Sequence, residues 1–358
     1  MTRLFRGKRI LITGGTGSLG KVLTRNILAN HDNLPKKITI FSRDEAKQHE
    51  MRLEFRRLQE ATEEIKYADS EEILEFRIGD VRNFSSVASA IRQADIVMNA
   101  AALKQVPNCE YFPYEAVQTN IEGAENIVRA IETLQLPVET VVGISTDKAC
   151  KPVNVMGMSK AIQERIFVQA NLRCPNTRFI CVRYGNVLAS RGSVIPLFQS
   201  QIRAGGPVTI TNPDMTRFLL SLNQAVQTIF DGYARGARGD IFVPRIRSSQ
   251  ITNIARAMIA GRNIKLMETG IRPGEKVHEV LVAEDEAYRT ATTPDYYIIK
   301  PLLPELMTES NGMGVLRTEY SSHQDVMNFE ETVALLTANR LMVEEYGTRA
   351  MAAGELLR

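Results

Sequence analysis

Short apolar runs alternate with helix-type stretches through the first half of the chain. Continuous apolar runs of four to eight residues are typical of strands that are buried on both faces, as in a parallel sheet. Helical patterns lie between them, at 19–29 and over a long charged segment at 44–68. This alternation predicts an α/β fold with a Rossmann-type, doubly wound parallel sheet covered by helices on both faces. The predicted strands are 8–13, 37–41, 73–78, 95–99, 138–145 and 177–182.

The alternation weakens after about residue 185, where glycine, proline and arginine gather in loops. These loops predict a smaller C-terminal α/β domain for a substrate, and a helix at 223–233 is expected to return to the first domain. No low-complexity linker separates the two parts, so we expect them to share an interface. The predicted division is a dinucleotide-binding domain at 1–188 with 215–243, a substrate domain at 189–214 with 244–330, and a helical tail at 331–358 that is available to pack on a partner subunit.

Composition and charge exclude several classes of protein. A chain of 358 residues suits one dinucleotide-binding domain with a smaller partner domain. The net charge of +3 is small and scattered, which argues against a nucleic-acid partner. No apolar stretch approaches the roughly 20 residues of a membrane span, and the N-terminus lacks the apolar core of a signal peptide. With four cysteines, no CxxC pair and four histidines, we predict a cytoplasmic protein with reduced thiols and no metal site.

A glycine-rich turn joins the first predicted strand to the first predicted helix. It reads TGGTGSLG over 13–20. Glycines at this spacing let the backbone turn tightly and approach a pyrophosphate at the N-terminus of a helix. Because the flanking strand, the helix and the next strand stand at the required distances, we predict a dinucleotide site rather than an ordinary glycine turn. The turn residues expected at the cofactor are Gly14, Thr16, Gly17, Ser18, Leu19 and Gly20.

The end of the second predicted strand selects between NAD and NADP. An NAD enzyme usually has an acidic residue there, which binds the ribose 2′-hydroxyl. Here Ser42, Arg43 and Lys47 are suited to a 2′-phosphate, whereas Asp44 comes two positions late and is placed to cap the following helix. We therefore predict NADP and favour NAD less; the alternative is a basic helix start with no cofactor role. Further cofactor contacts are expected from Asp80, Val81, Ala100, Ala101 and Lys104.

The remaining motifs, taken in order, resemble those of a known family. Between about residues 6 and 323 the chain carries TGGTGSLG, SRDE, GDVR, NAAALKQVP, STDKA, the lysine of MGMSK, RYGNV, SRGSVIP, MTRF and RPGEK. This series is similar to that of the UDP-N-acetylglucosamine 4,6-dehydratases of bacterial surface-sugar pathways, which are extended short-chain dehydrogenases. The resemblance is closest to the C5-inverting type of capsule and O-antigen pathways. One departure is a longer charged stretch at about 57–72.

Short-chain dehydrogenases usually place a tyrosine one helical turn before a lysine that holds the cofactor ribose. Here Lys160 is present, but Met156 stands at the tyrosine position. A thioether cannot exchange a proton, so the catalytic base must come from another residue or the protein is inactive. The resemblance associates methionine at this position with the capsule-type branch, and so keeps both Met156 and Lys160 among the catalytic-site residues.

The resemblance assigns the acid and the base to Asp147 and Lys148, at the end of the fifth predicted strand. It implies that hydride leaves C4 of the sugar for NADP+, that Lys148 removes the C5 proton and that Asp147 protonates the departing C6 hydroxyl. Hydride then returns to C6, and Thr146 orients or relays the C4-hydroxyl proton. A neutral lysine and a protonated aspartate near pH 7 both require shifted pKa values, which an adjacent buried pair can produce. The sequence leaves open which residue holds which proton.

The resemblance also implies a UDP-N-acetylhexosamine substrate. Arginines suit its diphosphate, and Glu275 suits a ribose or sugar hydroxyl. Taken singly, each arginine has the alternative of a solvated loop position. His278 and His323 are as compatible with structural roles as with substrate contacts, and Asn120 is expected to hold backbone around the site. The substrate residues predicted in this way are Lys104, Asn186, Ser190, Arg191, Arg217, Arg272 and Glu275.

Two other functions remain open at this point. A UDP-hexose 4-epimerase shares the first hydride transfer, but it needs a tyrosine at position 156 and has no need of the Asp147–Lys148 pair. A non-catalytic NADP-binding regulatory protein would explain Met156, but it has no reason to keep the sugar-binding motifs. The family resemblance further implies a homo-oligomer, either a dimer or a hexamer.

Overall fold

The computed structural model describes residues 4–61, 70–188, 193–307 and 314–343. Within these residues the main sheet has ten strands in the order β16-β14-β15-β10-β6-β5-β4-β1-β2-β3. The strands from β10 to β3 in this order are parallel, and the three beyond β10 are antiparallel. The parallel strands are β1 (Arg9–Thr13), β2 (Lys37–Ser42), β3 (Leu74–Ile78), β4 (Ile96–Asn99), β5 (Thr140–Thr146), β6 (Arg178–Tyr184) and β10 (Ile241–Pro244).

The six strands expected in the first half are all present, and the order of β3, β2, β1, β4, β5 and β6 is that of a doubly wound sheet. The predicted fold class is therefore confirmed. The chain reverses its direction of winding between β1 and β4, and the carboxyl ends of these strands form the crevice where such folds bind ligands. The fifth strand begins two residues later than expected and runs to Thr146, which brings the STDKA motif to this edge.

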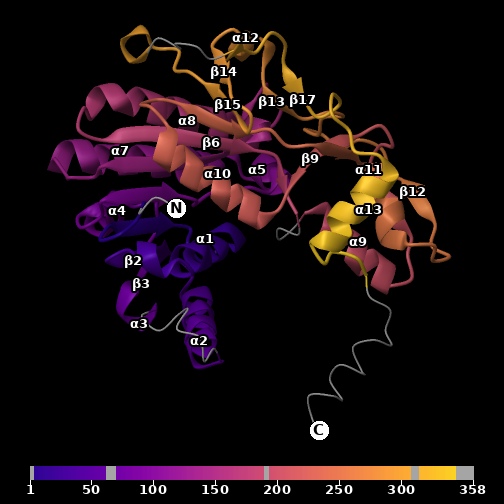
Figure 1. Cartoon of the computed structure of the whole chain (residues 1–358), viewed down its shortest axis with the longest axis horizontal. Coiled ribbons are helices and arrows are strands. Elements are labelled where there is room, and N and C mark those ends of the chain that lie inside the picture. Colours follow the sequence, from indigo (N-terminus) through magenta and orange to yellow (C-terminus); the bar gives the residue numbers. More distant parts are fainter. Residues whose placement is uncertain (1–3, 62–69, 189–192, 308–313, 344–358) are drawn as a thin grey trace.

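Helices cover both faces of the sheet (Figure 1). On one face α1 (Ser18–Leu28) packs against α10 (Leu222–Arg235), which covers the helix predicted at 223–233. On the other face lie α4 (Phe84–Ile91), α7 (Gly123–Leu134) and α8 (Val155–Arg173). Other helices are α2 (Glu45–Ala61), α3 (Ser70–Ile73), α5 (Val106–Tyr111), α6 (Pro113–Ala116), the π-helix η3 (Val117–Glu122), and the 3-10 helices η1 (His31–Asn33), η4 (Asp147–Ala149) and η5 (Pro304–Leu306).

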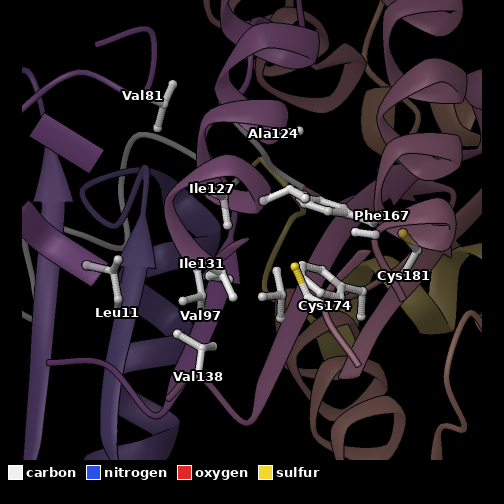
Figure 2. Packing of buried hydrophobic residues seen from close by; sticks show 14 of the residues in the cluster. Leu11, Val81, Val97, Ala124, Ile127, Ile131, Val138, Phe167, Cys174 and Cys181 are labelled. Carbon is white, nitrogen blue, oxygen red and sulfur yellow. The ribbon is translucent and has the colours of Figure 1, made fainter. Parts of the chain in front are cut away.

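Buried aliphatic and aromatic side chains fill the layer between the sheet and α7 and α8 (Figure 2). Leu11 and Val97 of the sheet face Ile127 and Ile131 of α7, and Phe167 of α8 packs nearby. Each of these five side chains is at most 3% exposed. The strands are apolar on both faces because helices cover both, which is why the sequence shows continuous rather than alternating apolar runs.

The C-terminal half builds a second, smaller core. It contains α9 (Val194–Arg203), α11 (Ile251–Ile259) and α13 (Phe329–Ala338), which pack together at one end of the molecule (Figure 1). Small sheets join β11-β9-β7, β12-β8 and β13-β17. Their strands are β7 (Asn186–Val187), β8 (Val208–Ile210), β9 (Thr216–Leu220), β11 (Ser248–Gln250), β12 (Leu266–Glu268), β13 (Val280–Val282) and β17 (Tyr320–Ser321).

Two features differ from the predicted division of the chain. Part of 244–330 joins the main sheet beyond β10 rather than the second core, as β14 (Thr290–Thr292), β15 (Tyr296–Ile299) and β16 (Gly314–Val315), with α12 (Glu284–Ala287) just before them. The expected tail at 331–358 begins with α13, which packs on α11 in the second core. Residues 344–358 lie outside the described part, as does 62–69 of the charged segment. None of the described helices is both long and apolar enough to cross a membrane.

Candidate active site

The turn between β1 and α1 accepts only glycine at its first position. Gly14 has a φ of +64°, a region that L side chains rarely adopt, and its N–H donates to the carbonyl of Phe41 at 2.8 Å. A Cβ atom at Gly14 would lie 2.7 Å from the Cα of Ala101. Ala100 and Ala101, which follow β4, in turn donate their N–H groups to the backbone and side-chain oxygens of Thr13. The turn and the end of β4 thus pack backbone against backbone.

The start of α1 is suited to an anion. Gly17 is the N-cap residue, and no side chain caps the helix there. A Cβ at Gly20 would lie 2.3 Å from the carbonyl oxygen of Gly15, so the helix can begin this close to the turn only with glycine. Amides in the first turn of a helix lack intrahelical partners and bind phosphate well. The cradle therefore fits the pyrophosphate of a dinucleotide, with Thr16, Ser18 and Leu19 on the same turn.

The residues expected at a 2′-phosphate follow β2. Arg43 is exposed and its guanidinium lies 3.9 Å from the Asp80 carboxylate. Asp44 accepts a hydrogen bond from the N–H of Lys47 at 3.0 Å, which confirms that it caps α2. The ammonium of Lys47 also pairs with Asp44. The Ser42 hydroxyl accepts a hydrogen bond from Gln48 at 3.2 Å and keeps its own proton for donation. Arg43 and Ser42 are thus better placed for a phosphate than Lys47.

The segment after β3 is partly engaged in the fold. The Asp80 carboxylate is held by the Arg82 guanidinium at 2.7 and 2.9 Å. Val81 is 6% exposed; its side chain packs over Gly123 of α7 and its carbonyl accepts from Asn126. Val81 therefore has a place in the core as well as beside the predicted adenine. Lys104, after β4, is exposed at the same edge of the sheet.

The predicted acid and base lie together where β5 ends. The Thr146 hydroxyl donates to Asp147 Oδ1 at 2.8 Å, and Lys148 Nζ donates to the same oxygen at 3.1 Å. Asp147 is completely buried, whereas 22% of the Lys148 side chain is exposed. Glu279, which the sequence reasoning did not select, places Oε1 3.3 Å from Lys148 Nζ. Residues far apart in sequence thus form one buried carboxyl–amine–carboxyl group.

The charges in this group oppose the cost of burial. Burial favours the neutral acid and raises the pKa of Asp147. Burial alone would lower the pKa of Lys148, but the carboxylates of Asp147 and Glu279 outweigh it and raise that pKa. For Glu279, burial is outweighed by Lys148, Arg217 and Lys276, which lower its pKa. Asp147 is thus the carboxyl group that more readily holds a proton, and Glu279 the one that stays ionised.

Met156 and Lys160 lie on α8, which runs directly beneath this group. A Cβ at Gly157 would lie 2.2 Å from the carbonyl oxygen of Lys148, so the helix makes backbone contact with η4. Met156 is 4% exposed and packs in an apolar cluster with Cys109 and Ala116, where it has no polar role. Lys160 donates to the carbonyl of Ile144 at 2.5 Å and to Gln163 at 2.7 Å. Burial lowers the pKa of Lys160 to about 8.

Two buried polar residues hold the backbone around the site. Asn120 bonds both the N–H and the carbonyl of Leu103 and also the hydroxyl of Ser159, which is the structural role that the sequence suggested. Arg217 donates to the carbonyls of Thr216, Lys276 and Val277 at 2.8 to 3.0 Å. These bonds tie β9 to the segment that carries Glu279, so Arg217 has a structural task in addition to any contact with a diphosphate.

The other predicted substrate residues are more scattered. Asn186 has a buried Oδ1 without a hydrogen-bond partner among the described residues. Buried polar atoms usually have a partner, so this oxygen is suited to accept a hydrogen bond from a ligand. Arg272 lies on an exposed loop, and Glu275 accepts its backbone N–H at 3.3 Å. Ser190 and Arg191 lie outside the described residues. His278 bonds Thr216, and its ring centroid lies 5.3 Å from that of His323.

Sequence reasoning also missed a buried ion cluster behind the site. Arg183 of β6 pairs with Glu164 of α8 and Glu286 of α12, with closest distances of 2.6 Å to each. The Ser145 hydroxyl donates to Glu164 as well. Glu279 follows the RPGEK motif by three residues, so extending that motif to the next strand would have found it. Arg183 and its partners carried no such signal because they come from three distant segments.

A glycine cradle at the first strand–helix turn and a lysine paired with a buried aspartate at the end of the fifth strand are features of an extended short-chain dehydrogenase with a Rossmann-type sheet. A profile of the family described as "Polysaccharide biosynthesis protein" matches residues 10–301, and the chain belongs to this family. It is an enzyme of the type that modifies nucleotide sugars.

Relatives with two different activities are similar to this chain. A UDP-glucose 4-epimerase of Rickettsia canadensis is 43% identical over 354 residues, which are 96% of this chain and 99% of that protein. A UDP-N-acetylglucosamine 4,6-dehydratase (inverting) of Campylobacter jejuni is 41% identical over 311 residues, or 86% and 87% of the two chains. The X-ray structure of Pen from Bacillus thuringiensis superposes with a TM-score of 0.83 at 34% identity, and the match covers 94% of this chain and 99% of that one.

Proposed function

We propose that this protein is an NADP-dependent UDP-N-acetylglucosamine 4,6-dehydratase that inverts C5 and makes a UDP-4-keto-6-deoxy-N-acetylhexosamine for a bacterial surface glycan. The observation that carries this proposal is the hydrogen bond of Lys148 to the buried Asp147 at the end of β5. Elimination of water across C5 and C6 requires an acid and a base side by side, and a 4-epimerase does not. The similarity to an inverting dehydratase supports the same activity.

The glycine-only turn at Gly14 and the start of α1 without a side-chain cap support a nicotinamide dinucleotide, and we assign NADP because Ser42 and Arg43 are suited to a 2′-phosphate. The turn at 14–20 would hold the pyrophosphate, Ser42 and Arg43 the 2′-phosphate, Asp80 the adenine and Lys160 the nicotinamide ribose. When bound, the cofactor supplies an acceptor for the C4 hydride and a donor of hydride to C6. Lys160 would have to exchange its bond to the Ile144 carbonyl for one to the ribose.

The three residues at 146–148 then account for the protons. Thr146 is hydrogen-bonded to Asp147, so the proton of the C4 hydroxyl can pass through the threonine hydroxyl to the aspartate. Asp147 afterwards gives that proton to the C6 hydroxyl, which leaves as water. Lys148 removes the proton at C5 and returns it. In this scheme the relay through Thr146 takes the place of the tyrosine that Met156 replaces.

We assign the remaining contacts to the substrate half. Arg217 and Arg272, with Ser190 and Arg191 of the SRGSVIP motif, would bind the diphosphate. Asn186 would bind the substrate through its Oδ1, which has no hydrogen-bond partner among the described residues. Glu275 would bind a ribose or sugar hydroxyl, and Lys104 would bind beside the nicotinamide. The enzyme would work in the cytoplasm as a homo-oligomer, a dimer or a hexamer.

The test is to incubate the purified protein with UDP-N-acetylglucosamine in heavy water and to weigh the sugar nucleotide. We expect loss of one water, incorporation of deuterium at C5 and no requirement for added cofactor. Lys148→Ala should abolish dehydration while NADP stays bound, and Lys151→Ala serves as a matched control because Lys151 pairs with Glu319 on the surface. Full turnover of Lys148→Ala would remove the assignment of the base.

A second candidate is a UDP-sugar 4-epimerase, since several relatives above 40% identity are described as UDP-glucose 4-epimerases. The same incubation separates the two activities: an unchanged mass with a new C4 epimer would favour the epimerase. Bound NADP with no change in any UDP-sugar would favour the regulatory protein.

A further inference from the structure

Lys148 lies between two buried carboxyl groups rather than beside one. Its Nζ is 3.1 Å from Asp147 Oδ1 and 3.3 Å from Glu279 Oε1. The two carboxyl side chains are 1% and 4% exposed, whereas that of Lys148 is 22% exposed. Lys148 is therefore the member of the group whose side chain is partly exposed, and both carboxyl groups that hold its amine are buried.

Glu279 is fixed in place by the substrate half of the molecule. It directly precedes β13, its N–H donates to Ser322 Oγ at 2.9 Å, and its carbonyl accepts from the N–H of Ser322. Arg217 Nε lies 3.8 Å from the same Oε1 that faces Lys148. Its second oxygen, Oε2, is buried and has no hydrogen-bond partner among the described residues, as is also true of Asp147 Oδ2. A buried carboxylate oxygen without a partner is costly, so a structural salt bridge alone does not account for this arrangement.

We propose that Glu279 is the positioning residue of the lysine base: it holds Lys148 over the sugar and stores the lysine proton while the amine acts. This inference rests on the proposed dehydratase function. The charged groups that face Lys148 are Asp147 from its own strand end, Glu279 and Lys276 from the segment before β13, and Arg217 from β9. Of these, only the two carboxylates can accept a proton from Lys148.

The proton balance of the reaction selects Glu279 over Asp147. The two carboxylates raise the pKa of Lys148 despite its burial, so at neutral pH the residue rests as an ammonium and must lose a proton before it can act as a base. Asp147 is not available as the acceptor, because it has to carry the proton that the C6 hydroxyl takes when it leaves. Glu279 rests ionised at 3.3 Å and has no other proton to deliver.

The steps then balance. A proton moves from Lys148 Nζ to Glu279 Oε1, which turns a buried ion pair into a neutral pair. The neutral amine takes the C5 proton, the C5–H electron pair becomes the C5–C6 double bond, and the C6–O bond breaks as Asp147 protonates the oxygen. Once C6 has been reduced, the lysine returns a proton to C5 and recovers its own from Glu279. A sugar bound over Lys148 would displace water that favours the ion pair, which eases the first transfer.

The test compares the wild type with Glu279→Gln, using C5–H exchange in heavy water as a function of pH. With an internal acceptor, the wild-type rate should vary little across the neutral range. In Glu279→Gln the proton has to leave to solvent, so we expect a rate about 100-fold lower at neutral pH that recovers as the pH rises. KM and the content of bound NADP should stay unchanged. Glu319→Gln, on the surface of the same half, is the matched control and should behave as the wild type.

Three outcomes would overturn the inference. They are exchange by Glu279→Gln within threefold of the wild type at every pH, a loss of rate that is equal at every pH, and a loss that follows from missing NADP. If Glu279→Gln does not fold, Glu279→Asp takes its place, because it keeps the charge but moves it away from the amine. It should be slowed in C5 exchange at unchanged KM, and a full rate would contradict us. A wild-type protein without any C5 exchange would instead refute the dehydratase proposal itself.

Discussion

Replacing Arg183 with methionine should destabilise the fold more than any surface change of the same type. The guanidinium is 2% exposed and makes five hydrogen bonds: two to Glu164, two to Glu286 and one to the carbonyl of Leu281. Methionine keeps the apolar stem of the side chain but is shorter and supplies no charge. Glu164 would lose the cation that holds it, and Glu286 would keep only Arg289, at 3.6 Å. Removing one partner from a buried ion pair costs about 3–5 kcal/mol in the free energy of unfolding, and we expect a loss in this range.

The destabilisation by Arg183→Met should depend on pH, and the pKa of Glu286 determines in which direction. Burial alone would raise the pKa of Glu286, but Arg183 outweighs it and lowers that pKa to about 2. A depressed carboxyl pKa contributes stability above the ordinary value for glutamate, and this contribution is lost as the pH falls toward about 2. In Arg183→Met the pKa of Glu286 should instead rise, because burial is then opposed only weakly. The difference in stability between wild type and variant should therefore be largest near neutral pH and shrink as the pH falls.

The assay is urea unfolding of both proteins, followed by circular dichroism at several pH values. Arg247→Met is the matched control, because Arg247 also forks onto two carboxylates, Asp325 and Glu331, but on the surface. Solvent screens such pairs, so the control should unfold with the wild type. A loss below about 1 kcal/mol in Arg183→Met, or a loss that does not change with pH, would refute the reasoning.

Two further predictions concern the cofactor. Gly14→Ala should abolish NADP binding, since the new Cβ would meet Ala101 at 2.7 Å. The control is Gly261→Ala: Gly261 has a similar φ of +76° but open space around it, so this variant shows the cost of backbone strain alone, about 1–2 kcal/mol. NADP retained by Gly14→Ala as in that control would contradict the packing argument. Arg43→Ala should weaken NADP binding about 10- to 100-fold and leave NAD binding within threefold, as titration of cofactor-free protein would measure. Equal losses for both dinucleotides would reject the 2′-phosphate assignment, and the exposed Arg92→Ala should change neither affinity.

The first six parallel strands were predictable because most of them are buried on both faces and therefore read as apolar runs. The seventh, β10, was not predicted, and β3 is only partly buried. The antiparallel strands β14 and β15 were missed for the opposite reason. They are only three and four residues long, and they follow β13 and α12 in a part of the chain where the alternation of strands and helices has ended. β14 reads TAT and carries no apolar run, and the run YYII of β15 is at the lower limit of length for a strand. Helix α10 was found because its amphipathic face is long enough to be recognised wherever the helix packs.

The residues of the candidate site likewise fall into those that the sequence predicts and those that it does not. The glycine turn and the Thr146–Asp147–Lys148 group were predictable because each lies within one short stretch at a strand end. The partners of these residues were not, since pairing across the fold leaves no local pattern. Lys47 carries a predicted phosphate role but pairs with Asp44, and that spacing of three residues was a signal for an ion pair on the first turn of a helix.

The contacts of Arg217 and Glu279 could not be predicted from the sequence. An arginine in a loop motif suggests a phosphate ligand. The Arg217 guanidinium instead donates hydrogen bonds to three backbone carbonyls and so fixes the segment that carries Glu279. That segment brings a carboxylate from the substrate half to an amine from the dinucleotide half. Whether Lys148 can act as a base thus depends on how the two halves pack, because the groups that set its protonation come from both.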